Sequence, residues 1–171
     1  FTVTYAALHG KTLLFKPVKR MANDDVPERF ERDKPDVRYG MELFDVSTSL
    51  QGTEFLPFQP YYVKGIGAAG FANDTRKQID DLSDFVKKQG AKGLVVLWHD
   101  ADGYRASGAG SKLSDTEKSA IAQASASKPG DLVLMVADDK RMRVNESLGE
   151  LRHELGIRLK LGNPNELGFL W

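Results

Sequence analysis

The chain has 171 residues, 41% of them hydrophobic, which is enough for one domain with a core and a flanking piece. Its 24 basic and 24 acidic residues cancel, so no global field draws it to nucleic acid or to an anionic membrane, and any RNA contact must be local. It has no cysteine, which excludes disulfides and thiolate metal sites, and no apolar run approaches the roughly 18 residues of a membrane span.

Residues 1–16 alternate apolar and polar side chains loosely, which predicts a strand or hairpin with a turn at residues 9–11. Pro27 interrupts a stretch that would otherwise suit a short helix. The chain starts without an initiator Met or a signal peptide and ends at Phe169-Leu170-Trp171 without a polar tail. We therefore expect both ends to be cut ends of a longer protein.

The middle of the chain alternates short apolar runs with helical patterns. In chain order we expect strands at 55–58 and 61–66, a helix at 74–89, a strand at 93–98, a surface loop at 104–113, a helix at 114–125, a strand at 132–137 and a helix from about 140 to 159. Pro57 confines the first strand to an edge or a bulge, whereas the run at 132–137 predicts a central strand. Such an order gives an α+β fold, a two-layer sandwich with helices on one face of a small, mostly antiparallel sheet.

Each predicted helix has a start signal. Asn73 or Asp74 would cap the first, Ser114 and Glu117 form a capping box for the second, and Asp138 or Asp139 would cap the third. Gly90 would end the first helix in the left-handed conformation. The side chains expected to face the core are Ile79, Leu82, Phe85, Val86, Ala120, Ile121, Ala124, Val144, Leu148, Leu151, Leu155 and Leu159.

Gly65, Gly67 and Gly70 fit the spacing of a dinucleotide-binding loop, G-x-G-x-x-G, but we reject that interpretation. In a true site the glycines open the helix whose amides face the pyrophosphate, and here the helix cannot start before residue 73. No acidic residue ends a second strand about 20 residues later. We expect residues 65–70 to be a strand end and a flexible loop.

His99-Asp100 suggests a catalytic base, because His titrates near neutrality and a carboxylate can orient it. No third partner lies nearby in sequence, and the three His residues are too scattered to give ligand spacing. We therefore predict no catalytic residue and no metal site in this chain.

Five basic residues are candidates for contact with RNA phosphates: Arg105 and Lys112 in the expected loop, and Lys140, Arg141 and Arg143 at the start of the last helix. Cations in a first helical turn oppose the helix dipole, which is an unfavourable position without a reason. The alternative is that Asp138 and Asp139 neutralise them as ordinary surface pairs.

Several segments together resemble a known family. They are Pro17-Val18-Lys19-Arg20-Met21, residues 33–43 (D-K-P-D-V-R-Y-G-M-E-L), residues 87–94, Leu113-Ser114 with Glu117, Lys128-Pro129-Gly130-Asp131 with the strand after it, Val144-Asn145, Leu148-Gly149, Leu151-Arg152, Leu155-Gly156 and Phe169-Leu170-Trp171. They are similar to the domain inserted in the catalytic domain of bacterial-type aspartyl-tRNA synthetases, called GAD after the amidotransferase and the synthetase that share it. The resemblance covers residues 17–171.

Residues 33–43 carry the most specific part of this resemblance, and Asp33, Lys34, Asp36 and Arg38 are its family hallmark residues. Glu31-Arg32, just before it, departs from the Gly-Ser usual in the family. On residue chemistry alone, the start of this segment is an ordinary solvated turn with a weak surface ion pair.

The resemblance implies that residues 1–40 are a flanking catalytic-domain segment, residues 41–161 the GAD insertion, and residues 162–171 the return to the catalytic domain. It implies a parent aspartate-tRNA ligase that uses ATP and Mg, charges tRNA(Asp), works as a cytoplasmic homodimer, or in an organelle, and contacts no membrane. No ATP-binding signature precedes the resemblance, so we expect this piece alone to lack catalysis, to bind no cofactor and to be accessory to the rest of the catalytic domain. Alternatives are the homologous domain of a tRNA-dependent amidotransferase and an independent binding module or enzyme.

Overall fold

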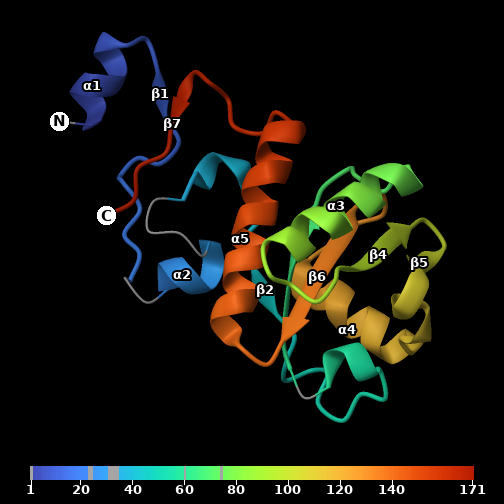
Figure 1. Cartoon of the computed structure of the whole chain (residues 1–171). Coiled ribbons are helices and arrows are strands. Elements are labelled where there is room, and N and C mark those ends of the chain that lie inside the picture. Colours follow the sequence, from blue (N-terminus) through green and yellow to red (C-terminus); the bar gives the residue numbers. More distant parts are fainter. Residues whose placement is uncertain (1, 23–24, 31–34, 60, 74) are drawn as a thin grey trace.

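A five-stranded antiparallel sheet with strand order β2-β3-β6-β4-β5 forms the centre of the molecule in this computed structural model, which describes residues 2–22, 25–30, 35–59, 61–73 and 75–171 (Figure 1). Its strands are β2 (Phe44–Asp45), β3 (Tyr62–Ala68), β4 (Val95–Asp100), β5 (Gly103–Ala106) and β6 (Leu132–Asp138). The strands expected near 61–66, 93–98 and 132–137 are confirmed, each with slightly different bounds.

Strand β6 is the middle strand, as the apolar run predicts. It pairs with β3 along its whole length, from Tyr62 opposite Asp138 to Ala68 opposite Leu132, and with β4 on its other edge. Residues 132–136 are completely buried. Only a strand covered on both faces and paired at both edges satisfies such a continuous apolar run.

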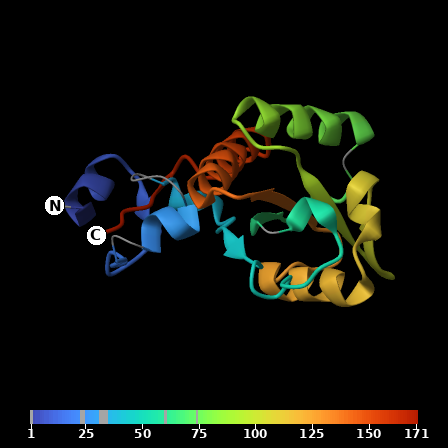
Figure 2. The same cartoon turned by 60° about the horizontal axis from the view of Figure 1, so that its bottom comes forward.

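The helices lie on both faces of the sheet. Helices α3 (Arg76–Lys88) and α5 (Arg141–Arg158) cover one face, while α4 (Asp115–Ser125) and the 3-10 turn η2 (Leu56–Phe58) cover the other (Figure 2). The α+β class is confirmed, but the expected two-layer arrangement with helices on one face is wrong. The reason is that alternate residues of β6 are apolar on both sides, so both faces of the sheet need a cover.

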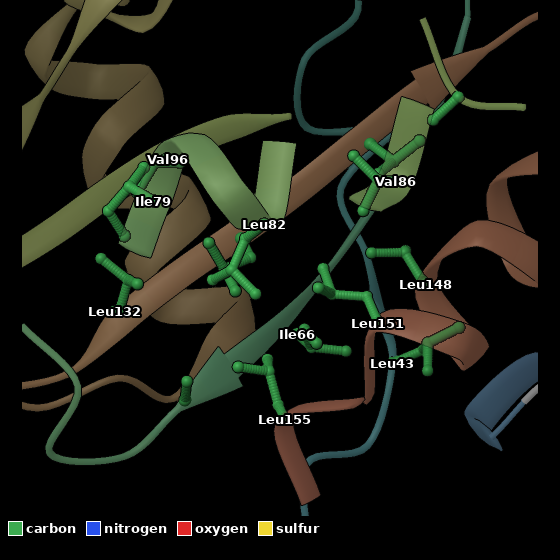
Figure 3. Close-up of a cluster of buried hydrophobic side chains, with 14 of the residues drawn as sticks. Leu43, Ile66, Ile79, Leu82, Val86, Val96, Leu132, Leu148, Leu151 and Leu155 are labelled. Carbon is green, nitrogen blue, oxygen red and sulfur yellow. The ribbon is translucent and has the colours of Figure 1, made fainter. Parts of the chain in front are cut away.

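The larger core lies between the sheet and helices α3 and α5, whose leucines and valines interleave in Figure 3. Ile79, Leu82 and Val86 reach it from α3. From α5 it receives the predicted Val144, Leu148, Leu151 and Leu155. Phe85 and Leu159 are only partly buried at its edge.

The helix caps agree with the sequence in part. Helix α4 starts with the predicted Ser114–Glu117 capping box, and its inward residues are Ile121 and Ala122, whereas Ala124 is exposed. Helix α3 starts later than expected, since Thr75 forms a capping box with Gln78, so Asn73 is not the cap. The alternative cap, Asp74, lies outside the described residues.

Four other expectations are wrong in detail. Residues 2–8 form a helix (α1, Thr2–Leu8) before the short strand β1 (Thr12–Leu13), and residues 56–58 form η2 and no strand. The expected loop at 104–113 contains β5 and the turn η3 (Gly108–Lys112). Pro27 lies inside helix α2 (Asp25–Phe30). Pro27 occupies the first turn of α2, where its missing amide would have no helical acceptor. At 56–58, η2 lets Phe55 and Phe58 both turn inward.

The two ends of the chain lie side by side (Figure 1). Strand β7 (Glu166–Leu167) pairs in parallel with β1, Thr12 opposite Glu166, and Leu170 bridges to Lys19. A single turn η1 (Val37–Tyr39) follows α2. These flanks meet the sheet domain along one side of α5.

We predict that both faces of the sheet carry comparable stability. Leu82→Ala on α3 and Ile121→Ala on α4, both completely buried, should each cost about 2–5 kcal/mol and lower Tm by roughly 5–15 °C. Asp81→Ala, on the exposed side of α3, is the matched control and should stay within about 0.5 kcal/mol. A near-neutral Ile121→Ala in thermal unfolding would contradict the second core.

Candidate functional site

Helix α5 has a second buried face besides the leucine face that the sequence predicts. The residues Arg141, Asn145, Gly149, Arg152 and Gly156 recur at spacings of four, four, three and four, so they share one narrow stripe of the helix. Four of them, from Asn145 on, are buried. We call this set the flank-facing stripe, because Glu28 and residues 36–41 contact three of its members, Arg141, Arg152 and Gly156.

Arg152 is the centre of the stripe and is 3% exposed. Its guanidinium donates hydrogen bonds to the carbonyl oxygens of Met41 (2.9 Å), Asp36 (2.7 Å) and Gly40 (3.1 Å). The aromatic rings of Phe30 and Tyr39 lie 5.0 and 5.5 Å from it. Such a buried cation holds the backbone of residues 36–41 in one conformation, because each carbonyl needs its donor.

The hallmark residues Asp36 and Arg38 are brought together beside the stripe. Asp36 accepts hydrogen bonds from the Arg38 amide (3.1 Å) and from its guanidinium Nε (2.9 Å) and Nη2 (2.6 Å). Hydrogen bonding from Arg38 therefore holds the pKa of Asp36 below its ordinary value, although partial burial opposes this. Asp33 and Lys34, the other two hallmark residues, lie outside the described part of the chain.

Arg38 also ties the hallmark segment to the C-terminal flank. Its Nη1 atom lies 3.2 Å from the carbonyl oxygen of Asn163 and 3.4 Å from that of Glu166. On the other side, Tyr39 packs against Gly156 of α5 so closely that a Cβ there would overlap the ring. The hallmark segment is thus a connector between the two flanks and α5, and Gly156 is required for its close approach.

A second polar contact lies at the start of α5. Lys64 of β3, whose side chain is 2% exposed, forms an ion pair with Glu28 of α2, and Arg141 donates to the same Glu28 carboxylate at 2.6 Å. Burial disfavours the charged form of Glu28, but the hydrogen bonds from Lys64 and Arg141 outweigh it and lower the pKa of Glu28. Three elements that are distant in sequence meet at this one carboxylate.

Asp138, at the end of β6, is completely buried and fixes the turn into α5. It accepts hydrogen bonds from the Lys140 amide (3.0 Å) and the Arg143 guanidinium (2.9 Å), and Lys92 lies 3.8 Å away. It does not cap the helix, because the N-cap position is Lys140, which makes no side-chain cap. Burial opposes ionisation of Asp138, and its hydrogen bonds with Asp139, Lys140 and Arg143 overcome this and lower its pKa to about 2.

Arg105 and Lys140, two of the five candidate RNA-contact residues, lie toward opposite ends of the sheet. Arg105 sits opposite Trp98, which pairs with Leu132 at the start of β6, whereas Lys140 follows the end of that strand. Six strand residues separate the two ends by about 20 Å. Lys112 is exposed in η3, which packs beside Val95 at the start of β4.

Three of the five take part in ion pairs. Arg105 contacts Asp100 (2.9 Å) and covers the Trp98 ring at 4.5 Å. Arg141 and Arg143 pair with Glu28 and Asp138 as described above. Lys112 and Lys140 are exposed, and within the described ranges neither side chain has an ion-pair partner.

His99 and the glycine motif occupy structural positions. The Nδ1 atom of His99 lies 3.1 Å from the Ser127 hydroxyl, and its ring lies 4.5 Å from that of Tyr104, while Asp100 pairs with Arg105. Gly65 and Gly67 lie inside β3, which corrects the expected loop. A Cβ at Gly65 would lie 2.6 Å from Phe44, so this glycine permits close packing of β2.

No cluster of three or more His, Asp or Glu side chains in the ranges that the structure describes could hold a metal ion. None of the helices in the same ranges combines the length and apolar character needed to cross a membrane.

Comparison with known proteins identifies the sheet domain. The family model described as GAD domain matches residues 61–148, about half of the chain. This stretch runs from β3 to the middle of α5, so it includes the central strands of the sheet and most residues of both cores. The chain therefore belongs to the GAD domain family.

Longer relatives match nearly the whole chain. The aspartate–tRNA(Asp/Asn) ligases of Desulfatibacillum aliphaticivorans and Symbiobacterium thermophilum are 38% and 41% identical over 160 residues, which is 91% of this chain and 27% of each relative. The aspartate–tRNA ligase of Bacteroides fragilis is 37% identical over 161 residues, 92% of this chain and 28% of the relative. The chain thus spans just over a quarter of the length of these relatives.

Sequence reasoning missed Glu28, Lys64 and the role of Arg152. The only signal for Arg152 was a charged residue on the same side of the helix as Gly149 and Gly156, a stripe that the leucine pattern overshadows. Lys64 stands between apolar residues of a predicted strand, which indicates a buried amine but no partner.

We predict that the free energy of unfolding of Asp138→Asn falls less at acid pH than that of the original protein. The folded pKa of about 2 lies below the unfolded value of about 3.9, so the carboxylate stabilises the fold above pH 4, and this contribution of about 2 kcal/mol is lost as the pH falls from 4 to 2. Urea unfolding at pH 2–7 should show a smaller loss of stability for the variant. Asp115→Asn, with a 99% exposed side chain, is the control and should keep the original slope.

Proposed function

We propose that this chain is the GAD insertion domain of an aspartate-tRNA ligase together with the flanking pieces of its catalytic domain. The observation that carries the proposal is that the ligase relatives match 91–92% of the chain, flanks included, whereas the GAD family model covers residues 61–148 alone. The parent would activate aspartate with ATP and Mg²⁺ and esterify the end of tRNA(Asp). This piece would be accessory to that chemistry.

The proposed borders are residues 1–40 and 162–171 for the catalytic domain and 41–161 for the insertion. In support, the two flanks pair with each other through β1 and β7 and through Lys19 and Leu170, as expected where a chain leaves a domain and returns to it. The two strands between which the insertion is placed are thereby held side by side.

The remainder of the catalytic domain would be the principal partner of the flanks. Val3, Leu8 and Trp171 are 62%, 78% and 82% exposed, so the flanks carry large apolar side chains on their surface. A surface of this kind favours burial against another part of the protein. We also propose that the parent is a homodimer in the bacterial cytoplasm. The ligase relatives are bacterial, which supports a bacterial origin of the parent.

The amidotransferase alternative is less well supported. A GAD domain in that setting would have no reason to carry the hallmark segment and the Phe169–Trp171 return. Here both lie in the region matched by ligases over 160 residues. An independent enzyme finds no support in the geometry of His99 or the glycine motif.

We predict that the chain alone forms no aspartyl-adenylate and charges no tRNA. Aspartate-dependent pyrophosphate exchange and aminoacylation should stay at the blank level for the purified chain. The complete parent, expressed from the full coding sequence with the same tag, is the positive control and should be active in both assays. Pyrophosphate exchange by the isolated chain above the blank would contradict the accessory role. An inactive complete parent would refute the ligase assignment.

For tRNA, we propose a phosphate contact at the start of α5 around Lys140. Lys92, Lys140, Arg141 and Arg143 gather at this end of the sheet, and the exposed Tyr62 starts the neighbouring strand. Lys92, Arg141 and Arg143 form ion pairs with Asp138, Asp139 or Glu28. Lys140 is therefore the cation of this group whose charge is most available to a phosphate. Such a contact would position the acceptor end and read no bases.

In the complete parent, Lys140→Glu should weaken tRNA binding several-fold and make its dependence on salt shallower, because at least one phosphate contact is lost. Adenylate formation should not change. Lys112→Glu, in the turn η3 beside β4 and β5, is the matched control with the same change of charge. Equal effects of the two substitutions in filter binding at several salt concentrations would indicate a general field effect and contradict a local contact.

A further inference from the structure

The polar contacts made by Arg141 and Arg152 lie at different positions along the axis of α5. Arg141 and Arg152 are eleven residues apart, which is about 16 Å along the axis. Arg141 reaches Glu28 of α2, and Arg152 reaches the carbonyls of residues 36–41. Two separated attachment points prevent rotation of one body on another, which a single contact cannot do.

One backbone hydrogen bond and one ion pair join α2 to the residues just before β2. The Leu43 amide donates to the Arg29 carbonyl at 2.8 Å, and the Arg29 guanidinium binds both oxygens of Glu42 at 2.8 and 2.5 Å. Phe30, the last residue of α2, is 3% exposed and lies under the Arg152 guanidinium. Helix α2 is therefore attached to the segment that leads into β2.

Lys64 makes this attachment specific. A buried ammonium without a counter-ion is strongly unfavourable, and the only carboxylate that pairs with Lys64 among the described residues is Glu28. Moving α2 away from the sheet would separate the Lys64 ammonium from this carboxylate. The position of Lys64 in β3 therefore makes the separation of α2 from the sheet unfavourable.

We propose that Glu28, with Lys64 and Arg141, and Arg152, with its three carbonyls, are positioning residues that lock α2 and residues 36–41 to the sheet domain as one rigid body. The mechanical border of the insertion then lies before α2, and not at residue 40. In the parent this lock sets the direction in which the GAD domain projects from the catalytic domain, a consequence that rests on the proposed function. Arg141 acts inside the protein, beside the proposed contact at Lys140.

The Leu43 amide reports opening of the lock, since its acceptor is in α2. In the 171-residue chain, Glu28→Gln should speed hydrogen exchange at Leu43 by tenfold or more while leaving Leu134, at the centre of β6, unchanged. Glu154→Gln removes a carboxylate that pairs with Arg158 within α5 at 2.6 Å, and as the control it should change neither amide. Unchanged exchange at Leu43, or equal acceleration at both amides, would overturn the lock.

A double variant separates locking from simple neutralisation of Lys64. Glu28→Gln with Lys64→Met removes both charges, so it should restore the melting temperature lost in the single variant. If Glu28 positions α2, exchange at Leu43 should remain fast in the double variant, because the link between α2 and β3 is still absent. Recovery of slow exchange at Leu43 would show that Glu28 serves only to neutralise a buried amine.

The consequence for the parent is measured separately. Glu28→Gln in the complete protein should raise the KM for tRNA severalfold with little change in aspartate-dependent pyrophosphate exchange, and Glu154→Gln should change neither. An unchanged KM together with fast Leu43 exchange would leave the lock standing and refute its part in tRNA positioning. An inactive wild-type parent would instead reject the proposed function and leave the exchange result intact.

Discussion

Burial of the Arg152 guanidinium is the constraint on which the arrangement of this chain depends. A cation that is 3% exposed must find several acceptors inside the protein, and here it takes three main-chain carbonyls from one short segment. Because the neighbouring side of α5 packs in the leucine core, the helix is buried on two adjoining faces. The flanks and the sheet domain consequently share one helix, and neither can be arranged without the other.

Elements set by local chemistry could be predicted from the sequence. The strand at 132–138 and the Ser114–Glu117 capping box depend on neighbouring residues, and both are confirmed. The helix at residues 2–8 and the turn at 56–58 could not, since short segments adopt either form according to what they pack against. The second helical layer was overlooked, although Val133 and Met135 point away from Leu132 and Leu134 by strand alternation alone.

In the functional region, only contacts between residues close together in the sequence could be predicted. Asp36 and Arg38 are two residues apart, and their resemblance to a family hallmark singled them out. Glu28 lies 36 residues from Lys64 and 113 from Arg141, so no spacing rule connects them. A lone charge in an apolar pattern indicates that a partner exists, while the identity of that partner depends on the tertiary fold.

The same contacts explain why a neutral chain with 24 charges of each sign does not simply present a mixed surface. Lys64, Arg152 and Asp138 are buried. Lys64 pairs with Glu28 of α2, Arg152 binds the carbonyls of residues 36–41, and Asp138 pairs with Arg143 of α5. Cations counted along the sequence at the start of α5 therefore overstate the charge available to RNA. A lysine without a carboxylate partner, such as Lys140, is a better indicator of an outward-facing site than a cluster of arginines, because arginine's planar guanidinium so often serves internal pairs.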